Sequence, residues 1–419
     1  MSLGCTLGER ARRQEPLAFD PGTHPSTYWR RRETDGVVSP LLVVGLAVAV
    51  FVGFNIGGSS TGVAFGPAVG SGLVSKLAAA GLMTVFALLG AATAGRRVIE
   101  TLGGKIVPSS EFTLLVSVII LLFVGLALLV SNTFGVPAST SMTAVGAIAG
   151  LGVATGTLQE PEMARIVGWW LVSPVLAFWI CAVVGRYFYP YLDANFRIDR
   201  SAGAVVERDG LSVSLADGAS RQELLGTVAV VAVACYMAFS AGASNAANAV
   251  GPLVGSPAAN LSIDAGVILA SAAVGLGAFT IARRTLDTVG NDLTDLPILA
   301  ALIVEIVAAS LISFLSWIGV PASLAVSATM SIVGLGWGRA TRTTTIGDAV
   351  RGDAPDVSVD ALAADTSADD TVPGVGEPDD LLAEDLFDPG TTGRVIFFWI
   401  LTPSLSFAAS YGLFRVAPI

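Results

Sequence analysis

Apolar runs separated by short polar connections fill most of this chain. Most of the runs are as long as the roughly 18 residues that a helix needs to cross a bilayer. They cover residues 38–57, 73–94, 112–130, 140–153 and 167–184 in the first half, and 225–242, 246–253, 263–281, 296–318, 322–338 and 395–414 in the second. The pattern predicts an all-α polytopic membrane protein with about 10 to 12 transmembrane segments.

Four motifs occur twice, in the same order. The matched segments are GSSTGVAFGP at Gly58 with ASNAANAVGP at Ala243, GRRVIETLGG at Gly95 with ARRTLDTVGN at Ala282, GVPAS at both Gly135 and Gly319, and Trp170 with Trp399. The first and third pairs lie 185 and 184 residues apart and the last pair 229, so about 45 residues are inserted in the second copy. We expect two inverted-topology repeats, related by an axis in the membrane plane, with broken or re-entrant helices.

These repeats and the polar segments between them define the expected organisation. The predicted parts are a polar N-terminal tail (1–36), a first membrane repeat (37–186), an inter-repeat loop (187–223), a second membrane repeat (224–340), an acidic disordered loop (341–392) and the final helix of the second repeat (393–419). A solvated tether is the expected role of the acidic loop, with partner binding as the alternative.

Composition narrows the class of protein. The chain is 53% hydrophobic and only 13% charged, with 33 acidic against 23 basic residues and a net charge of -10. This acidity indicates a salt-rich cytosol, as in a halophilic archaeon, although one acidic loop on an ordinary membrane protein is the alternative. The three cysteines lack the spacing of a metal site, and the one histidine lies in the N-terminal tail. We therefore expect neither an enzyme, nor a bound metal, nor a cofactor.

The segment from Tyr236 to Gly255, YMAFSAGASNAANAVGPLVG, places polar side chains inside a predicted membrane span. Ser244 and Asn248 are four residues apart and share a helix face, with Asn245 beside them. A hydroxyl or amide in hydrocarbon needs a partner, and Pro252 is expected to break the helix just after the amides. These features are typical of a transporter site near the bilayer midplane, although hydrogen bonds that only join helices are the alternative.

The first copy of this motif carries Asn55, Ser59 and Ser60 at similar positions, followed by Pro67, which is also expected to break its helix. Polar side chains therefore gather at the same place in both repeats. We predict that these residues bind or couple an ion.

A second polar cluster begins a predicted helix, where Ser139, Thr140 and Ser141 follow Pro137. Free N–H groups, the positive end of the helix dipole and three hydroxyls would meet there, which is suited to an anion. Helix capping and hydroxyl bonds to preceding carbonyls are the alternative. The second copy keeps Ser323 but continues with apolar residues.

Charged residues within the apolar runs are few. Glu305 lies in the middle of a span, where an ionisable side chain is costly, so it is either a cation or proton ligand or a hydrogen-bonded structural acid. Arg96 and Arg97 are expected to pair with Glu100 at a helix end.

The repeated motifs resemble those of the inorganic phosphate transporter (PiT, Pho4-type) family. That family carries two GANDxANAxG(T/P) motifs, two PVSTTH motifs and a GGRVVET-like segment, which GASNAANAVGP, GVPASTS and GRRVIET resemble in order and spacing. The resemblance covers nearly all of the membrane region. It implies inverted repeats, a homodimer in the cell membrane, and symport of phosphate with Na⁺ or H⁺.

The chain departs from the family pattern at the charged positions. Ser60 and Asn245 stand where the family has aspartates, which are its expected cation ligands. Losing two negative charges weakens sodium binding and also removes repulsion from an anionic substrate. Glu305, where the family also tends to have a glutamate, is then the main remaining candidate for coupling.

The prediction is a secondary transporter of inorganic phosphate, coupled to Na⁺ or H⁺. A permease for another oxyanion such as sulfate, and a ligand-sensing relative that does not transport, are the alternatives. The predicted substrate-binding residues are Ser139, Thr140, Ser141, Ser244, Asn245, Asn248 and Ser323, and the predicted ion-binding or coupling residues are Asn55, Ser59, Ser60 and Glu305.

Overall fold

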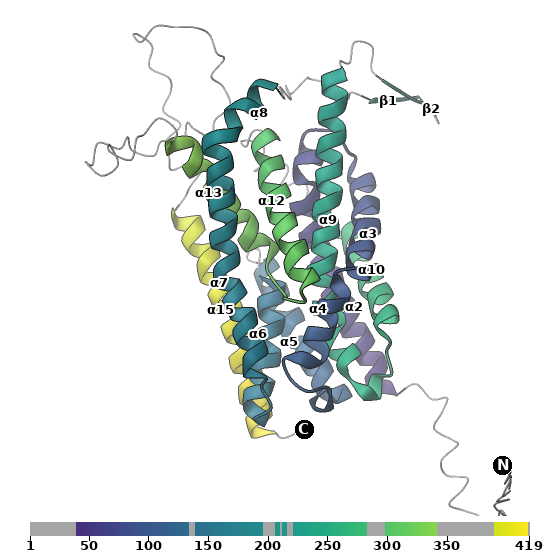
Figure 1. The fold of residues 1–419 in the computed structure, drawn as a ribbon. Coiled ribbons are helices and arrows are strands. Elements are labelled where there is room, and N and C mark those ends of the chain that lie inside the picture. Colours follow the sequence, from purple (N-terminus) through teal and green to yellow (C-terminus); the bar gives the residue numbers. More distant parts are fainter. Residues whose placement is uncertain are drawn as a thin grey trace, which may run out of the picture. The chain divides into compact units, whose positions relative to one another are not determined.

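The computed structural model describes residues 39–133, 139–195, 206–209, 212–215, 221–282, 298–341 and 389–417. The helices of the first half are α2 (Pro40–Gly70), α3 (Lys76–Ala92), α4 (Gly95–Glu100) continued by a π-helical turn (Thr101–Lys105), α5 (Leu114–Thr133), α6 (Thr140–Thr155), α7 (Glu160–Val183) and α8 (Tyr189–Asn195). Those of the second half are α9 (Arg221–Gly255), α10 (Ile263–Thr280), α12 (Ile298–Trp317), α13 (Leu324–Ala340) and α15 (Pro389–Val416) (Figure 1).

The described residues contain one β-sheet, which is a short antiparallel hairpin. Strand β1 (Val206–Asp209) pairs with β2 (Ser212–Leu215), and Val206 lies opposite Leu215. The hairpin lies within the predicted inter-repeat loop. The N-terminal tail and most of the acidic loop lie outside the described residues.

Three helix pairs of the two halves are displaced by the offsets of the repeated motifs, which supports the repeat. Helices α5 and α12 are both 20 residues long and start 184 residues apart. Helices α6 and α13 are also offset by 184 residues, and α7 and α15 by 229. Each pair is thus displaced by the same number of residues as the motifs that it carries.

Packing between the halves shows that the second copy is inverted. Along α2 and α10 the contacts advance together, because a Cβ added at Gly53 would lie 2.6 Å from Ala273 and one at Gly58 would lie 2.9 Å from Ile281. Helices α2 and α10 therefore run parallel. A short turn reverses the chain between α9 and α10, and Gly266 packs back against Val254. Helix α9 consequently runs opposite to its counterpart α2, as the inverted repeat predicts.

Glycines let the backbones of the two copies touch, and these contacts occur in matched pairs. A Cβ at Gly57 would be 1.9 Å from the Val274 carbonyl oxygen, and one at its counterpart Gly242 would be 2.1 Å from that of Ala87. Helices in a bilayer gain little from burying apolar surface against each other, so such close van der Waals packing holds them together.

The small-residue face of α9 has the same role. A Cβ at Gly255 would lie 2.2 Å from the Gly103 carbonyl oxygen, and Gly251 packs on Leu102. The π-helical turn after α4 therefore approaches the backbone of α9 closely at these two glycines.

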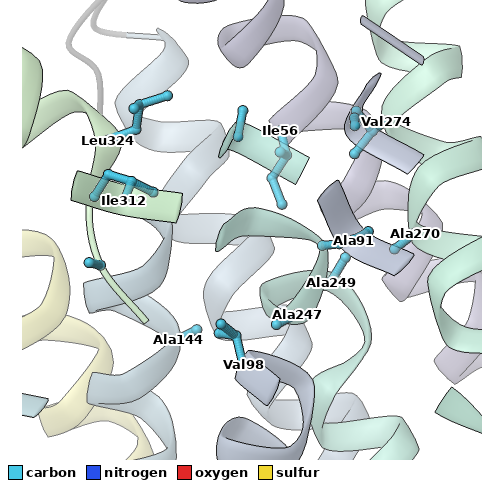
Figure 2. Close-up of a cluster of buried hydrophobic side chains, with 14 of the residues drawn as sticks. Ile56, Ala91, Val98, Ala144, Ala247, Ala249, Ala270, Val274, Ile312 and Leu324 are labelled. Carbon is cyan, nitrogen blue, oxygen red and sulfur yellow. The ribbon is translucent and has the colours of Figure 1, made fainter. Parts of the chain in front are cut away.

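Buried apolar side chains from both copies fill the space between these helices. Ile56 and Ala91 of the first copy belong to the same buried cluster as Val274, Ile312 and Leu324 of the second (Figure 2). Many of the buried positions are alanines. Small side chains keep the helices close, which places the polar face of α9 beside the beginnings of α6 and α13.

The expected helix breaks at Pro67 and Pro252 are wrong. Both prolines lie inside continuous helices, because α2 runs on to Gly70 and α9 to Gly255. A proline removes one backbone hydrogen bond of a helix, but both helices continue past the proline before they end. The break lies between Lys76–Ala92 and Gly95–Lys105, which are bent by 62°.

By length and composition, five helices of the described residues could cross a membrane, or six if the bent pair is counted as one span. Segments Leu114–Val130 and Thr140–Thr155 are shorter apolar helices. Two of the runs counted in the expected 10 to 12, residues 225–242 and 246–253, form the single helix α9.

Candidate functional site

Two serines start helices α6 and α13 in the same way. Ser139 has an extended backbone (φ -79°, ψ 97°), and its hydroxyl accepts a 3.3 Å hydrogen bond from the Met142 N–H. Ser323 accepts a 3.4 Å bond from the Val326 N–H. Capping therefore accounts for part of the role of both hydroxyl groups. The other N–H groups of each first turn have no helical acceptor and leave a positive end on each helix.

The polar face of α9 joins these two helix starts. The Ser244 hydroxyl donates to the Ala322 carbonyl at 2.7 Å, just before α13 begins. Its oxygen lies 3.3 Å from that of Ser141 in α6, and Asn248 Nδ2 donates to Ser141 at 3.1 Å. Ser244 and Asn248 thus share one helix face, as predicted, and that face contacts the beginnings of α6 and α13.

These bonds have a direction that determines which donors remain. Ser244 has one hydroxyl hydrogen, which it gives to Ala322, so Ser141 donates to Ser244 and accepts from Asn248. Asn248 Nδ2 also contacts Asn245 Oδ1 at 3.3 Å. The hydroxyl hydrogens of Ser139 and Ser323 are not used by the caps, whose bonds occupy only their oxygens. Donors for a further partner therefore remain around this chain of bonds.

One polar atom of the cluster has no partner. Asn248 is fully buried, and its Oδ1 makes no hydrogen bond with any described residue. An unsatisfied buried amide oxygen is costly, of order 1–3 kcal/mol. The two Nδ2 bonds fix the orientation of this amide, because a 180° rotation would turn Oδ1 toward the Asn245 oxygen and toward Ser141, whose one hydrogen goes to Ser244. Asn248 therefore offers an acceptor to a bound molecule.

The seven predicted substrate-binding residues lie in or beside this hydrogen-bond network. We call all seven the serine–asparagine cluster. Ser139, Ser141, Ser244, Asn248 and Ser323 are buried, and Thr140 and Asn245 are half-buried. None of the seven carries a charge at neutral pH. Among the described residues, no group of three His, Cys, Asp or Glu side chains could hold a metal ion.

The first copy of the motif is arranged differently. Asn55 Nδ2 donates to the Phe51 carbonyl at 2.8 Å, and the Ser59 hydroxyl lies 3.2 Å from the carbonyl oxygens of both Asn55 and Ile56. Ser60 is half-buried. The bonds of Ser59 stay within α2, whereas those of Ser244 and Asn248 reach other helices. Ser59 and its counterpart Ser244 therefore bond differently, and the counterpart of Asn248 is Val63, which has no polar side chain.

Glu305 lies in α12 and is buried, with 7% of its surface exposed. It makes no hydrogen bond or ion pair with any described residue. Ala309, one turn later on the same face, accepts a 3.1 Å bond from Ser240 of α9. Glu305 is thus on the side of α12 that faces the helix carrying Ser244.

Sequence reasoning missed several groups that complete the site. The Ala322 carbonyl is a backbone acceptor, which residue types do not reveal. Ser117 donates to the Pro252 carbonyl at 2.8 Å and so ties α5 to the end of α9. The signal that could have found it is a serine in a predicted apolar span that must find a partner.

The chain is similar to known membrane transporters. A family model described as the phosphate transporter family matches residues 56–410. The chain is 32% identical to the sulfate permease CysP of Bacillus subtilis, over 70% of this chain and 77% of that protein. A Pyrococcus furiosus protein assigned as a phosphate permease is 22% identical over 72% of this chain and 89% of its own length.

A solved structure of a sodium-dependent phosphate transporter has a similar fold. It superposes with a TM-score of 0.62 and 18% identity, and the match covers 90% of this chain and all (100%) of that one. At this identity the likeness concerns the fold alone. It agrees with the all-helical architecture described above.

Proposed function

The chain belongs to the phosphate transporter family, and on that premise we propose that it moves a tetrahedral oxyanion across the cell membrane, with sulfate as the preferred cargo. It is a multi-pass membrane transporter and not an enzyme. The proposed binding site is the serine–asparagine cluster, where the beginnings of α6 and α13 meet the polar face of α9.

The absence of charge in the cluster is the observation that carries this proposal. Its seven side chains offer hydroxyl and amide groups, and two helix starts add N–H donors and positive dipole ends. Hydrogen bonds from such neutral groups hold an anion without a counter-charge. A carboxylate side chain would repel the anion, and the cluster contains no such side chain.

Donor chemistry favours sulfate over phosphate at this site. Sulfate carries no hydrogen at neutral pH, so every one of its oxygens accepts. Phosphate keeps at least one P–OH group there, which needs an acceptor, and the strongest acceptor is a carboxylate. Ser60 and Asn245 stand where the resembling family has aspartates. The sulfate permease relative from Bacillus subtilis supports the same choice.

Phosphate is the second candidate, and one atom favours it. The unpartnered Asn248 Oδ1 could accept a hydrogen bond from a P–OH group. The relative assigned as a phosphate permease also supports this cargo. An amide oxygen is a weaker acceptor than a carboxylate, so we rank phosphate below sulfate.

Coupling and assembly complete the proposal. A cluster without carboxylates is a poor site for Na⁺, which prefers charged oxygen ligands, so we propose that an ion gradient is coupled through Glu305 and favour protons. We also propose that the protein works as a homodimer, as the family resemblance implies.

Uptake into proteoliposomes tests this function. Purified protein should accumulate labelled sulfate, unlabelled sulfate or selenate should compete strongly, and phosphate should compete weakly. Na⁺ and H⁺ gradients are imposed separately to identify the coupling ion. Stronger uptake of phosphate than of sulfate would reverse the ranking, and binding of either anion without uptake would indicate a sensor. The proposal would be rejected if the protein neither bound nor took up either anion.

A further inference from the structure

The connection between α12 and α13 is a non-helical segment that leads directly into the proposed site. Gly319, two residues after the end of α12, has a left-handed conformation (φ +77°), and the Gly319 and Val320 N–H groups donate to the Ser316 and Leu315 carbonyls at 3.0 and 2.8 Å. This is a Schellman motif, in which the two N–H groups satisfy the carbonyls of Leu315 and Ser316. It leaves the carbonyls of Trp317, Ile318 and Gly319 without backbone donors.

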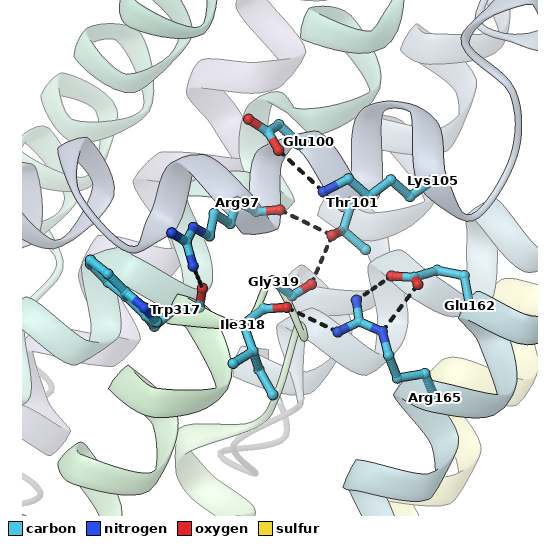
Figure 3. Close-up of polar contacts among 9 residues, drawn as sticks. All are labelled: Arg97, Glu100, Thr101, Lys105, Glu162, Arg165, Trp317, Ile318 and Gly319. Atoms are coloured by element: carbon cyan, nitrogen blue, oxygen red, sulfur yellow. Dashed lines mark hydrogen bonds and ion pairs between the residues drawn. The ribbon is translucent and has the colours of Figure 1, made fainter.

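Each of these three carbonyls is bound by a side chain from the first repeat (Figure 3). Arg97 Nη1 donates to the Trp317 carbonyl at 2.6 Å, and Arg165 Nη1 donates to that of Ile318 at 2.9 Å. The Thr101 hydroxyl donates to the Gly319 carbonyl at 2.8 Å. Two arginines at the carbonyl end of a helix also complement its dipole.

Further donors continue along the connection. Trp170 Nε1 donates to the Pro321 carbonyl at 2.8 Å, and Ser244 binds the Ala322 carbonyl. Five carbonyls between Trp317 and Ala322 are therefore held by side chains. The connection ends at Ser323, which caps α13 inside the proposed site.

Further contacts fix the positions of the Arg97 and Arg165 side chains. The Arg97 guanidinium lies 4.5 Å from the centre of the Trp317 ring, and Arg165 makes a second contact through Nε and Nη2 with Glu162, at 3.1 and 2.5 Å. The expected pairing of Arg96 and Arg97 with Glu100 is wrong. Arg96 pairs with Asp264 and Glu100 with Lys105, because the bend before α4 turns Arg97 toward α12.

We propose that Arg97 and Arg165 are positioning residues for oxyanion transport, which hold the α12–α13 connection so that Ser323 and the Ala322 carbonyl stay in register with Ser244. The inference rests on the proposed function of the same site. Two other roles are open to these arginines: attracting the anion by charge alone, or stabilising the fold alone. Both roles make different predictions from positioning.

Charge-conserving variants separate positioning from attraction. Arg165→Lys and Arg97→Lys keep the charge but lose the planar fork that directs each bond. Sulfate uptake by each should show a KM raised by about tenfold, the scale of one charge-assisted hydrogen bond, with a smaller change in Vmax. Thr101→Val, which removes one hydroxyl from a buried site, should raise KM by about threefold to tenfold. Arg96→Gln is the matched control, because it removes a neighbouring charge without touching the connection, and its KM should stay within about twofold.

A double-mutant cycle asks whether Arg165 acts through Ser323. If it does, Arg165→Lys should raise KM much less in a Ser323→Ala background than in the wild type. Additive effects would overturn the proposal, as would an equal rise in KM for Arg96→Gln. A lowered melting temperature with unchanged KM would assign the arginines to stability alone.

A second measurement does not depend on transport. Ser323 is buried, so a cysteine introduced by Ser323→Cys should react slowly with a membrane-permeant maleimide, and adding Arg165→Lys should speed that reaction at least about fivefold, since the segment opens more often. The chain without Ser323→Cys measures the background from the native cysteines. An unchanged labelling rate overturns the positioning role. If the wild-type protein takes up no sulfate but Arg165→Lys still speeds the labelling of Ser323→Cys, the proposed function is rejected and the positioning role is retained.

Discussion

Ser141 of the first repeat and Ser244 of the second lie with their hydroxyl oxygens 3.3 Å apart. The contact joins the first turn of α6 to the middle of α9, so the proposed site is built by both repeats at their junction. In an inverted-repeat transporter a junction of this kind is where relative movement of the repeats would alter binding most. The bond between these two serines is therefore the most direct structural target for substitution.

Ser141→Ala should impair sulfate uptake more strongly than Thr143→Val. Removing the Ser141 hydroxyl takes a donor from Ser244 and an acceptor from Asn248, which leaves buried polar groups unpaired at a cost of about 1–3 kcal/mol. Uptake at low sulfate should fall by about tenfold or more. Thr143 is equally buried, but it bonds only to the Ser139 carbonyl of its own helix. Equal losses in the two variants would indicate a general effect on α6 and not a role in binding.

Asn245→Asp should change the selectivity of transport. A carboxylate repels sulfate and accepts the hydrogen of a P–OH group, so the ratio of phosphate to sulfate uptake should rise by about tenfold. Asn245→Ala is the control, since it removes the amide without adding charge and should weaken uptake of both anions alike. Adding Ser60→Asp to Asn245→Asp restores both charges of the resembling family and should also introduce a dependence on Na⁺. A selectivity ratio that stays at the wild-type value would argue against the donor argument for sulfate.

Gly242→Ala should destabilise the protein. The new methyl group would lie 2.1 Å from the Ala87 carbonyl oxygen, which is backbone and cannot move without shifting α3. Overpacking of this kind costs about 1–3 kcal/mol, so the melting temperature in detergent should fall by several degrees. Gly168→Ala is the matched control in α7, because a Cβ there has no atom within 4 Å and alanine favours a helix. A similar fall for both variants would contradict the proposed role of the close helix contacts.

The repeat architecture could be predicted from the sequence because matched motifs at a constant offset are visible in the letters. The helix pairs α5 with α12 and α6 with α13 keep that offset, and α7 with α15 keeps the larger one. The position of the helix break could not be predicted in the same way. Pro67 and Pro252 lie within helices, whereas the bent segment around Gly95 contains no proline, and its bend depends on packing against Ala243 of α9.

Predicting the partners of the polar residues was possible only in part. The 3.6-residue period placed Ser244 and Asn248 on one face, but their contacts with Ser141 and Ala322 join segments more than 75 residues apart. The roles of Arg97 and Arg165 could not be found because they bind carbonyls, which every residue has. Only the left-handed turn at Gly319, just after α12, makes those particular carbonyls available.

Glu305→Gln should separate binding from coupling. The residue is buried in α12 and makes no ion pair with a described residue, so its carboxyl can change protonation without breaking a salt bridge. Glutamine has nearly the same shape and cannot release a proton. We expect proteoliposomes with the variant to exchange internal for external sulfate, while accumulation driven by an imposed proton gradient falls to background.

Glu305→Asp provides the matched comparison for this experiment. It keeps an ionisable carboxyl at the same place on α12, one methylene shorter, so gradient-driven accumulation should be reduced but present. The melting temperature of each variant shows whether a loss of accumulation comes from unfolding. Glutamine should be tolerated, because a neutral side chain in an apolar span costs less than a charged one. Normal proton-driven accumulation by Glu305→Gln would exclude Glu305 as the coupling residue. Loss of both exchange and accumulation in a folded Glu305→Gln protein would instead make Glu305 necessary for movement of the anion itself.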